Sequence, residues 1–381
     1  MLIIDGESLR LEDIIKVAVE KESIELSSIS KEKVEVSREY VNKIIENNEV
    51  VYGVTTGFGK FCNVNISSQD TRDLQVNLIR SHSAGVGEYL SEDAVRAMML
   101  LRANALAKGY SGIRYSTLQT LIDMLNKGVI PRVPSQGSLG ASGDLVPLAH
   151  MVLVMIGEGE ALYRGRVMPG KEAMQLAGIM PVTLEAKEGL ALINGTQAMT
   201  AIGSLALAEA INLSRIADIS AALTFEALNG VIDAFDENVN LVRPHKGQIE
   251  CARNMRKLLE GSQFVTHQGN PKVQDAYTLR CIPQVHGAVR DALEHIKEIV
   301  EIEMNSATDN PLIFPESDVV ISGGNFHGEP IAINMDYMGI AVSELASIAE
   351  RRIERLVNPS LNEGLPAFLV DNGGLNSGLM I

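Results

Sequence analysis

The chain contains no tryptophan, only 4% aromatic residues and only three cysteines among 381 residues. Cys62, Cys251 and Cys281 show no paired spacing and lie in no motif of a catalytic nucleophile, so they indicate buried or incidental thiols. A sparse, odd number of cysteines is typical of a reducing compartment. The N-terminus also lacks the apolar core of a signal peptide. We therefore expect a cytoplasmic protein.

Positive charge is also scarce, with 33 Lys and Arg residues against 48 Asp and Glu residues and a net charge of −15. This excess of acid argues against nucleic acids and anionic membranes as partners. The longest apolar runs, such as Met151–Ile156, are too short to span a bilayer. Because 46% of the residues are apolar, the chain is expected to fold around a large core.

Helical spacing of apolar residues dominates the chain. In the first half it predicts shorter helices over 91–108, 115–127 and 145–156, the last with Asp144 as its N-cap, and a hairpin over 159–167. In the second half it predicts long helices over 197–228, 284–304 and 334–356.

Helices this long and this apolar must bury more than one face, which favours a bundle that also packs against other subunits. We therefore predict a mainly α fold in two parts. Residues 1–195 form a mixed, loop-rich N-terminal domain, and residues 196–381 form a long-helix bundle.

The most specific segment is 137–150, which contains Ala141-Ser142-Gly143. In a tight loop the amide nitrogen of Gly143 can approach the carbonyl carbon of Ala141, because glycine bends without a Cβ clash. Ring closure with loss of one water, and loss of a second from Ser142, would give a methylidene-imidazolone electrophile. A plain glycine-rich turn is the alternative. A phosphate loop is disfavoured, since no Gly-Lys-Ser/Thr follows.

The longer string resembles the signature of the histidine and aromatic amino-acid ammonia-lyases, which carry this self-made group, 4-methylidene-imidazol-5-one (MIO). The resemblance covers essentially the whole chain. It implies a fumarase/aspartase-like helical core, MIO formed from Ala141, Ser142 and Gly143 without any metal, and a homotetramer in which three chains share each site. The sequence contains neither a His-Glu-x-x-His motif nor a cluster of His and Cys residues, so nothing in it indicates a metal site.

By this resemblance, four other residues carry the chemistry. Tyr52 removes the β-proton, Asn194 positions the electrophile and the substrate, and Arg280 grips the α-carboxylate with Tyr277 three residues before it on the same helical face. The plainer alternatives are a half-buried aromatic for Tyr52, a helix-start turn for Asn194 and a surface ion pair for Arg280.

The substrate preference rests on Ser81-His82, because this pair resembles the histidine-specific members. An imidazole has a donor and an acceptor, which a polar partner such as His82 suits. Phe326 is expected near the electrophile or the substrate ring, Glu329 in the polar network, and Gln274 among the substrate contacts.

We therefore predict an ammonia-lyase that converts L-histidine to urocanate. The alternatives are a phenylalanine or tyrosine ammonia-lyase or aminomutase on the same group, or an inactive helical assembly module. The last arises because family members continue beyond the position of Ile381, with further helices and a glutamate thought to meet the imidazole. A fragment, a truncated chain and a short homologue are all consistent with this.

Overall fold

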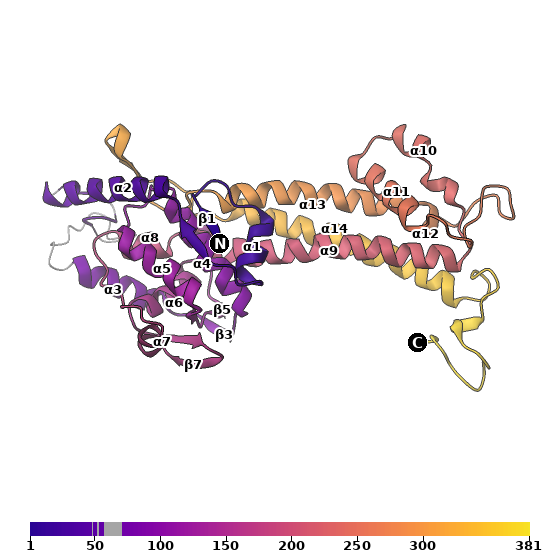
Figure 1. Ribbon diagram of the computed structural model, residues 1–381, viewed down its shortest axis with the longest axis horizontal. Helices are drawn as coiled ribbons and strands as arrows, with labels where there is room; N and C mark the ends of the chain where they lie inside the picture. The colour runs from indigo at the N-terminus through magenta and orange to yellow at the C-terminus, as the bar shows by residue number, and fades with distance from the viewer. Residues whose placement is uncertain (48, 52, 57–70) are drawn as a thin grey trace. The chain divides into compact units, whose positions relative to one another are not determined.

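A computed structural model describes residues 1–47, 49–51, 53–56 and 71–381 (Figure 1). Contacts divide the chain into two compact units, each made of two stretches of sequence. Unit 1 is Met1–Ala206 with Ile299–Ile333, and unit 2 is Leu207–Glu298 with Asn334–Ile381. The domain boundary near residue 195 stays a prediction.

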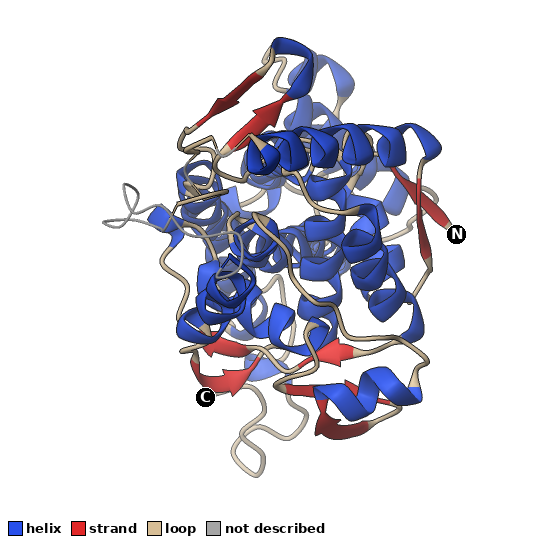
Figure 2. Cartoon of the chain, turned by 90° about the vertical axis from the view of Figure 1, so that its left-hand side faces the viewer, coloured by secondary structure: helices blue, strands red, loops and turns tan. Residues whose placement is uncertain are grey.

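Unit 1 combines short helices with small sheets, and helices dominate the chain as predicted (Figure 2). Its elements up to α8 are β1 (Leu2–Ile4), α1 (Leu11–Ala18), β2 (Ile24–Leu26), α2 (Ser28–Glu46), α3 (Thr71–His82), β3 (Val86–Tyr89), α4 (Glu92–Ala107), α5 (Tyr115–Lys127), β4 (Ile130–Pro131), β5 (Pro134–Gln136), α6 (Leu145–Met155), β6 (Glu160–Tyr163), β7 (Arg166–Pro169), α7 (Gly170–Leu176) and α8 (Glu188–Ile193). Strands β8 (Leu312–Phe314) and β9 (Val319–Ile321) complete it.

Helix α4 forms the centre of unit 1. Every residue from Ala94 to Ala107 is buried, and α1, α2 and α5 pack against it. Helix α6 contacts α3, α7 and α8. The predicted helices over 91–108, 115–127 and 145–156 are confirmed as α4, α5 and α6, and α5 ends at Gly128 in the left-handed conformation.

The strands of unit 1 are short and mostly antiparallel. β6 and β7 form the predicted hairpin, and β4 pairs with β6 to make a sheet of three strands. β1 and β2 pair in parallel. β3 pairs with β5, and Val86 stands opposite Gln136. This pairing holds the end of α3 next to the segment that leads into the Ala-Ser-Gly loop.

Unit 2 contains α10 (Glu237–Leu241), α11 (Lys246–Leu258) and α12 (Tyr277–Arg280). Its core joins Phe225, Phe235, Cys251, Met255 and Ile282, all fully buried. The rings of Phe225 and Phe235 lie 4.9 Å apart at 42°, a tilted geometry that aromatic pairs favour.

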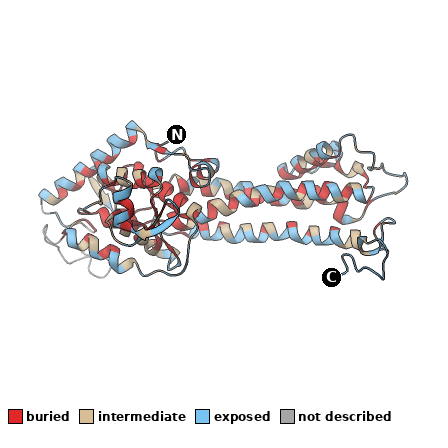
Figure 3. Cartoon of the chain, turned by 60° about the horizontal axis from the view of Figure 1, so that its bottom comes forward, coloured by how far each residue is buried: buried red, intermediate tan, exposed pale blue. Residues whose placement is uncertain are grey.

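Three long helices have residues in both units: α9 (Gln197–Ala227), α13 (Ile282–Met304) and α14 (Glu329–Val357). They confirm the long helices predicted from the sequence. Helix α14 begins at Glu329, five residues earlier than predicted. The helix can include Pro330 because this proline lies in the first turn, where its missing N–H costs little. Figure 3 shows exposed residues along the long helices.

Among the residues that the structure describes, one helical stretch, Glu188–Ala227, is long and apolar enough to cross a membrane. However, 78% of its most apolar window is buried inside the protein. That burial is characteristic of a core helix of a folded chain.

Candidate active site

The Ala-Ser-Gly segment folds into a single tight turn. Residues Gly140–Ser142 form one 3₁₀ turn, in which the Ser142 N–H donates to the Leu139 carbonyl at 2.8 Å and the Gly143 N–H to the Gly140 carbonyl at 3.2 Å. Gly143 has a φ of +85°, a conformation that only glycine adopts without strain. Ala141 is exposed, Ser142 is half-buried and Gly143 is buried.

Two distant segments hold this turn closely. The Asp144 N–H donates to the Gly195 carbonyl at 2.7 Å, and the Gly328 N–H donates to the Gly140 carbonyl at 2.9 Å. A Cβ on Gly143 would lie 3.0 Å from the Gly195 oxygen and 3.3 Å from the Phe326 oxygen. Both segments therefore pack closely against the residue whose nitrogen must close the ring, which fits a self-cyclising loop.

Asp144 occupies the N-cap position of α6, as predicted, but its side chain makes no capping hydrogen bond to that helix. Its backbone, at φ −83° and ψ 45°, departs from the extended conformation of an N-cap. Its carboxylate instead accepts the Ser138 hydroxyl at 2.5 Å and the Met199 N–H at 2.8 Å, and so caps α9. Burial raises the pKa of Asp144, and these hydrogen bonds oppose the rise.

Asn194 lies directly beside the turn, at the end of α8 and before Gly195. It is buried, its Nδ2 donates to the Asn310 carbonyl at 3.2 Å, and its own carbonyl accepts Arg102 Nη1 at 2.9 Å. Asn310 in turn accepts the Gly323 N–H on Oδ1 at 2.7 Å. The structure thus joins the 194, 310 and 323 segments into one polar network around the turn.

Sequence reasoning missed the buried charges behind this network. Arg102 donates to Gln197 Oε1 at 2.7 Å, and Gln197 Nε2 donates to Thr308 at 2.7 Å. Lys187 and Asp309 form a fully buried ion pair at 2.6 Å. The signal was present, because Arg102 lies among mostly apolar residues of α4 and a buried charge requires partners.

A second carboxyl lies near Asp144. Glu303 accepts the Thr196 hydroxyl at 2.5 Å. Burial raises the pKa of Glu303, the Thr196 hydrogen bond lowers it, and the negative charge of Asp144 raises it further. The start of α9 is therefore flanked by two acidic side chains with raised pKa values.

The predicted substrate pair Ser81-His82 ends α3. His82 Nδ1 lies 2.9 Å from the Leu78 carbonyl oxygen, which can only accept, so Nδ1 carries the proton in that bond. The chain then turns back toward the loop: the Gly85 N–H donates to His150 Nε2 at 3.0 Å, and a Cβ on Gly137 would lie 3.3 Å from Gly85 Cα.

Phe326 and Glu329 belong to the segment whose Gly328 N–H bonds the Gly140 carbonyl of the turn. Phe326 is half-buried, and its carbonyl oxygen is one of the two that lie close to Gly143. Glu329 is exposed at the start of α14, and its N–H donates to His327 Nδ1 at 3.2 Å. His327 is therefore engaged in a local turn.

The remaining predicted residues belong to unit 2 or lie outside the described residues. The guanidinium of Arg280 sits 4.5 Å from the centre of the Tyr277 ring, which confirms that both share one helical face. Tyr277 is 72% exposed, and Gln274 is also exposed. Tyr52 falls among the residues that the structure does not describe.

One buried group in unit 2, Asp218 with Cys251 and His286, is close enough to hold a metal ion. Its chemistry favours a hydrogen-bonded ion network instead. His286 Nδ1 lies 2.7 Å from Asp218 Oδ1, and Arg290 pairs with the other Asp218 oxygen at 2.5 Å. Burial raises the pKa of Cys251 well above its usual value, and its Sγ donates to Asp218 Oδ1 at 3.4 Å.

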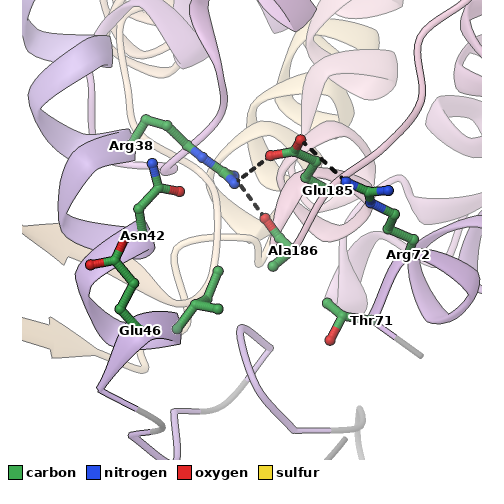
Figure 4. A pocket seen from close by; sticks show the side chains of 8 residues that line it. Arg38, Asn42, Glu46, Thr71, Arg72, Glu185 and Ala186 are labelled. Carbon is green, nitrogen blue, oxygen red and sulfur yellow. Dashed lines mark hydrogen bonds and ion pairs between the residues drawn. The ribbon is translucent and has the colours of Figure 1, made fainter. Parts of the chain in front are cut away.

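A polar hollow of about 250 Å³ lies elsewhere in unit 1 (Figure 4). Arg38 crosses it and donates to Glu185 and to the Ala186 carbonyl, both at 2.9 Å, while Arg72 reaches Glu185 at 4.0 Å. None of the site residues predicted from the sequence lines this hollow.

Comparison with known proteins shows that the chain belongs to a known enzyme family. The profile of the family described as "Aromatic amino acid lyase" matches residues 9–381. A histidine ammonia-lyase of Alkaliphilus oremlandii is 63% identical over 380 residues, covering 100% of this chain and 75% of the relative.

Two crystal structures superimpose over the whole chain. A tyrosine aminomutase of Streptomyces globisporus has a TM-score of 0.96 at 42% identity, with 75% of that chain covered. A histidine ammonia-lyase of Trypanosoma cruzi has a TM-score of 0.91 at 44% identity, with 71% of that chain covered.

Proposed function

Because the chain belongs to the aromatic amino acid lyase family, we propose that it is a histidine ammonia-lyase, which eliminates ammonia from L-histidine to give urocanate. The observation that carries this proposal is the tight Ala141-Ser142-Gly143 turn, held by the 194–195 and 326–328 segments. The names of the most similar relatives support histidine as the substrate.

We propose that the turn cyclises to MIO with loss of two waters. A bond forms between Gly143 N and the carbonyl carbon of Ala141, and the carbonyl oxygen leaves as water with the amide hydrogens of Gly143 and Ser142. Ser142 then loses its hydroxyl and its Cα hydrogen as the second water. Holding the reacting atoms in a tight turn supplies most of the required proximity.

The group supplies an electrophilic carbon that activates the α-amine for departure. Around it, Asn194 and nearby backbone N–H groups stabilise negative charge. In this proposal Tyr52 accepts the β-proton and Arg280 binds the α-carboxylate through two parallel hydrogen bonds. Tyr277 lies against the Arg280 guanidinium and orients it.

His82 provides the substrate preference in this proposal. Because Nδ1 donates to Leu78, the neutral ring leaves Nε2 as an acceptor for an imidazole N–H. Ser81 assists from the same turn of α3, and Phe326 packs near the substrate ring. Glu329 and Gln274 complete the polar contacts.

A homotetramer in the cytoplasm is part of the same proposal. Exposed apolar side chains recur along α9 and α14, a pattern typical of helices that pack against other subunits. They are Leu213, Ile216, Ile219, Leu223, Ile333, Tyr337, Ile340 and Ile353. Light scattering on the purified chain tests the assembly, and a monomer contradicts it.

Intact mass and product absorbance test the function. We expect the protein to be lighter than its encoded mass by two waters, and to give urocanate absorbance with L-histidine. A Ser142→Ala variant serves as the control, since it has no hydroxyl to lose as the second water. An unshifted mass in the parent protein supports an inactive assembly module instead.

A phenylalanine or tyrosine lyase or aminomutase on the same group is the second candidate. The likeness to the tyrosine aminomutase, with a TM-score of 0.96, favours it. The Ser81-His82 pair opposes it, because a polar ring partner does not match a phenyl group. Cinnamate or coumarate from phenylalanine or tyrosine, without urocanate from histidine, would select this candidate.

A further inference from the structure

Arg102 is a buried cation that touches the segment behind the Ala-Ser-Gly turn. Its side chain is fully buried within α4. Nη1 donates to the Asn194 carbonyl at 2.9 Å and to Gln197 Oε1 at 2.7 Å, and Nη2 donates to the Ala191 carbonyl. One guanidinium therefore joins the end of α8 to the start of α9 across the Asn194-Gly195 bend.

The charge of Arg102 persists at neutral pH. Burial lowers the pKa of Arg102 to about 10, and the negative charge of Asp309 opposes this fall. Hydrogen bonds from a charged donor are roughly twice as strong as neutral ones. The three acceptors are therefore held by a permanent cation.

Gly195 transmits this contact to the turn. A Cβ on Gly195 would lie 2.5 Å from Arg102 Nη1, so the guanidinium packs directly against this residue. Gly195 also packs against Gly143, where a Cβ would lie 3.0 Å from the Gly195 oxygen and 3.3 Å from its nitrogen. The order of contact is Arg102, then Gly195, then Gly143.

We propose that Arg102 is a positioning residue for cyclisation of the turn: its guanidinium fixes the Asn194-Gly195 peptide against which Gly143 is held. The inference rests on the proposed function, because it concerns the same two-water loss. Arg102 does not touch the reacting atoms. It acts by restricting the Asn194-Gly195 backbone, which packs against Gly143 and accepts the Asp144 N–H, and so limits the motion of the turn.

The same helix offers a matched control. Arg96 is also buried on α4, and it donates to the carbonyls of Val17 at 2.8 Å and Leu125 at 3.2 Å. Its removal takes charged donors away from buried carbonyls, as removal of Arg102 does. Neither Val17 nor Leu125 belongs to a segment that contacts the turn. A general loss of packing therefore affects both arginines, and a positioning role affects only Arg102.

The experiment compares Arg102→Met and Arg102→Lys with Arg96→Met and Arg96→Lys, all expressed for the same time. Intact mass gives the fraction of folded protein that has lost two waters, and thermal unfolding gives stability. We expect both Met variants to unfold at lower temperature. We expect only Arg102→Met to cyclise about tenfold more slowly, because it loses its charged hydrogen bonds. Arg102→Lys, which keeps the charge, should cyclise at an intermediate rate.

Two results overturn the inference. One is a folded Arg102→Met protein that loses both waters as fast as the parent, and the other is equal slowing in Arg96→Met. If Arg102→Met does not fold, the comparison of Arg102→Lys with Arg96→Lys decides in the same way. A parent protein that keeps its full encoded mass overturns the proposed function itself, and the inference with it.

Discussion

The carboxylate of Asp144 accepts the backbone N–H of Met199 at 2.8 Å, so the residue that precedes α6 caps the start of α9. The N-terminal N–H groups of a helix have no partner within the helix. Asp144 supplies one from 55 residues away, and its own N–H is bonded to Gly195. One residue thereby fixes both the Ala-Ser-Gly turn and the helix beside it.

Replacing Asp144 by Ala should destabilise the protein by about 1–3 kcal/mol, because buried α9 donors lose their acceptor. Urea unfolding measures the change. Ser27→Ala is the control, since Ser27 caps α2 near the surface and its loss costs about 1 kcal/mol. An Asp144→Ala variant that loses no more stability than Ser27→Ala contradicts the prediction.

Replacing Glu303 by Gln should stabilise the protein at neutral pH. Burial raises the pKa of Glu303 in the folded state, so the folded protein favours the protonated carboxyl. The ionised form therefore costs stability above the folded pKa. This cost disappears as pH falls through that pKa and is gone below the unfolded value of about 4.3.

Urea unfolding across this pH range should show an advantage of Glu303→Gln that shrinks on acidification. Glu298→Gln, an exposed change on the same helix, should show no such trend. An advantage that grows as the pH falls would reverse the assigned direction of the Glu303 pKa.

The contribution of Asp218 to stability should depend on pH in the opposite sense to that of Glu303. Burial acts to raise its pKa, but hydrogen bonds from His286 and Asn254 and the charge of Arg290 lower it overall. A lowered folded pKa gives stability that is present above the unfolded value of about 3.9 and is lost as pH falls through the folded pKa.

We expect Asp218→Asn to lower the free energy of unfolding at neutral pH, because Arg290 loses its carboxylate partner. We also expect the free energy of unfolding of this variant to fall less steeply as the pH is lowered. Exposed Asp371→Asn is the comparison. Denaturant unfolding from neutral to acid pH measures the free energy of unfolding of both variants. If Asp218→Asn loses stability in acid as steeply as the parent protein, the prediction is refuted.

The helices were predictable because their signals are local. The Gly128 stop of α5 and the Asn229-Gly230 end of α9 can be identified from adjacent residues, and Asn229 adopts the left-handed φ of +48°. The paired face of Tyr277 and Arg280 also follows from their spacing alone.

The support of the site was not predictable in this way. Arg102 and Asn194 are 92 residues apart, and Gln197 and Thr308 are 111 apart. Nothing in either local pattern specifies its partner. Asp144 shows the same limit, since its residue type and position fit a cap for α6 while tertiary packing directs it to α9.

Replacing Arg280 by Lys should lower kcat/KM for L-histidine about tenfold to a hundredfold, because the fork that binds a carboxylate through two bonds is lost. Steady-state kinetics measure the change. Arg253→Lys, an exposed change in the same unit, should leave kcat/KM unchanged. Equal kinetics for the Arg280→Lys and parent proteins exclude Arg280 as the carboxylate ligand.

Replacing His82 by Leu should change which substrate the protein prefers. His82 Nε2 is free to accept a hydrogen bond because Nδ1 donates to Leu78. Leucine removes that acceptor, and the unpaired imidazole N–H of bound histidine should then cost about tenfold to a hundredfold in kcat/KM. An apolar phenyl ring makes no such bond and should lose nothing.

The ratio of kcat/KM for histidine to that for phenylalanine measures this preference. The ratio should fall in His82→Leu and stay near the parent value in Ser83→Ala, because the Ser83 hydroxyl already donates to the Ile79 carbonyl at 2.8 Å. If the two variants give the same ratio of kcat/KM values, His82 does not determine which substrate ring is preferred. Specificity must then come from Phe326, Glu329 or Gln274.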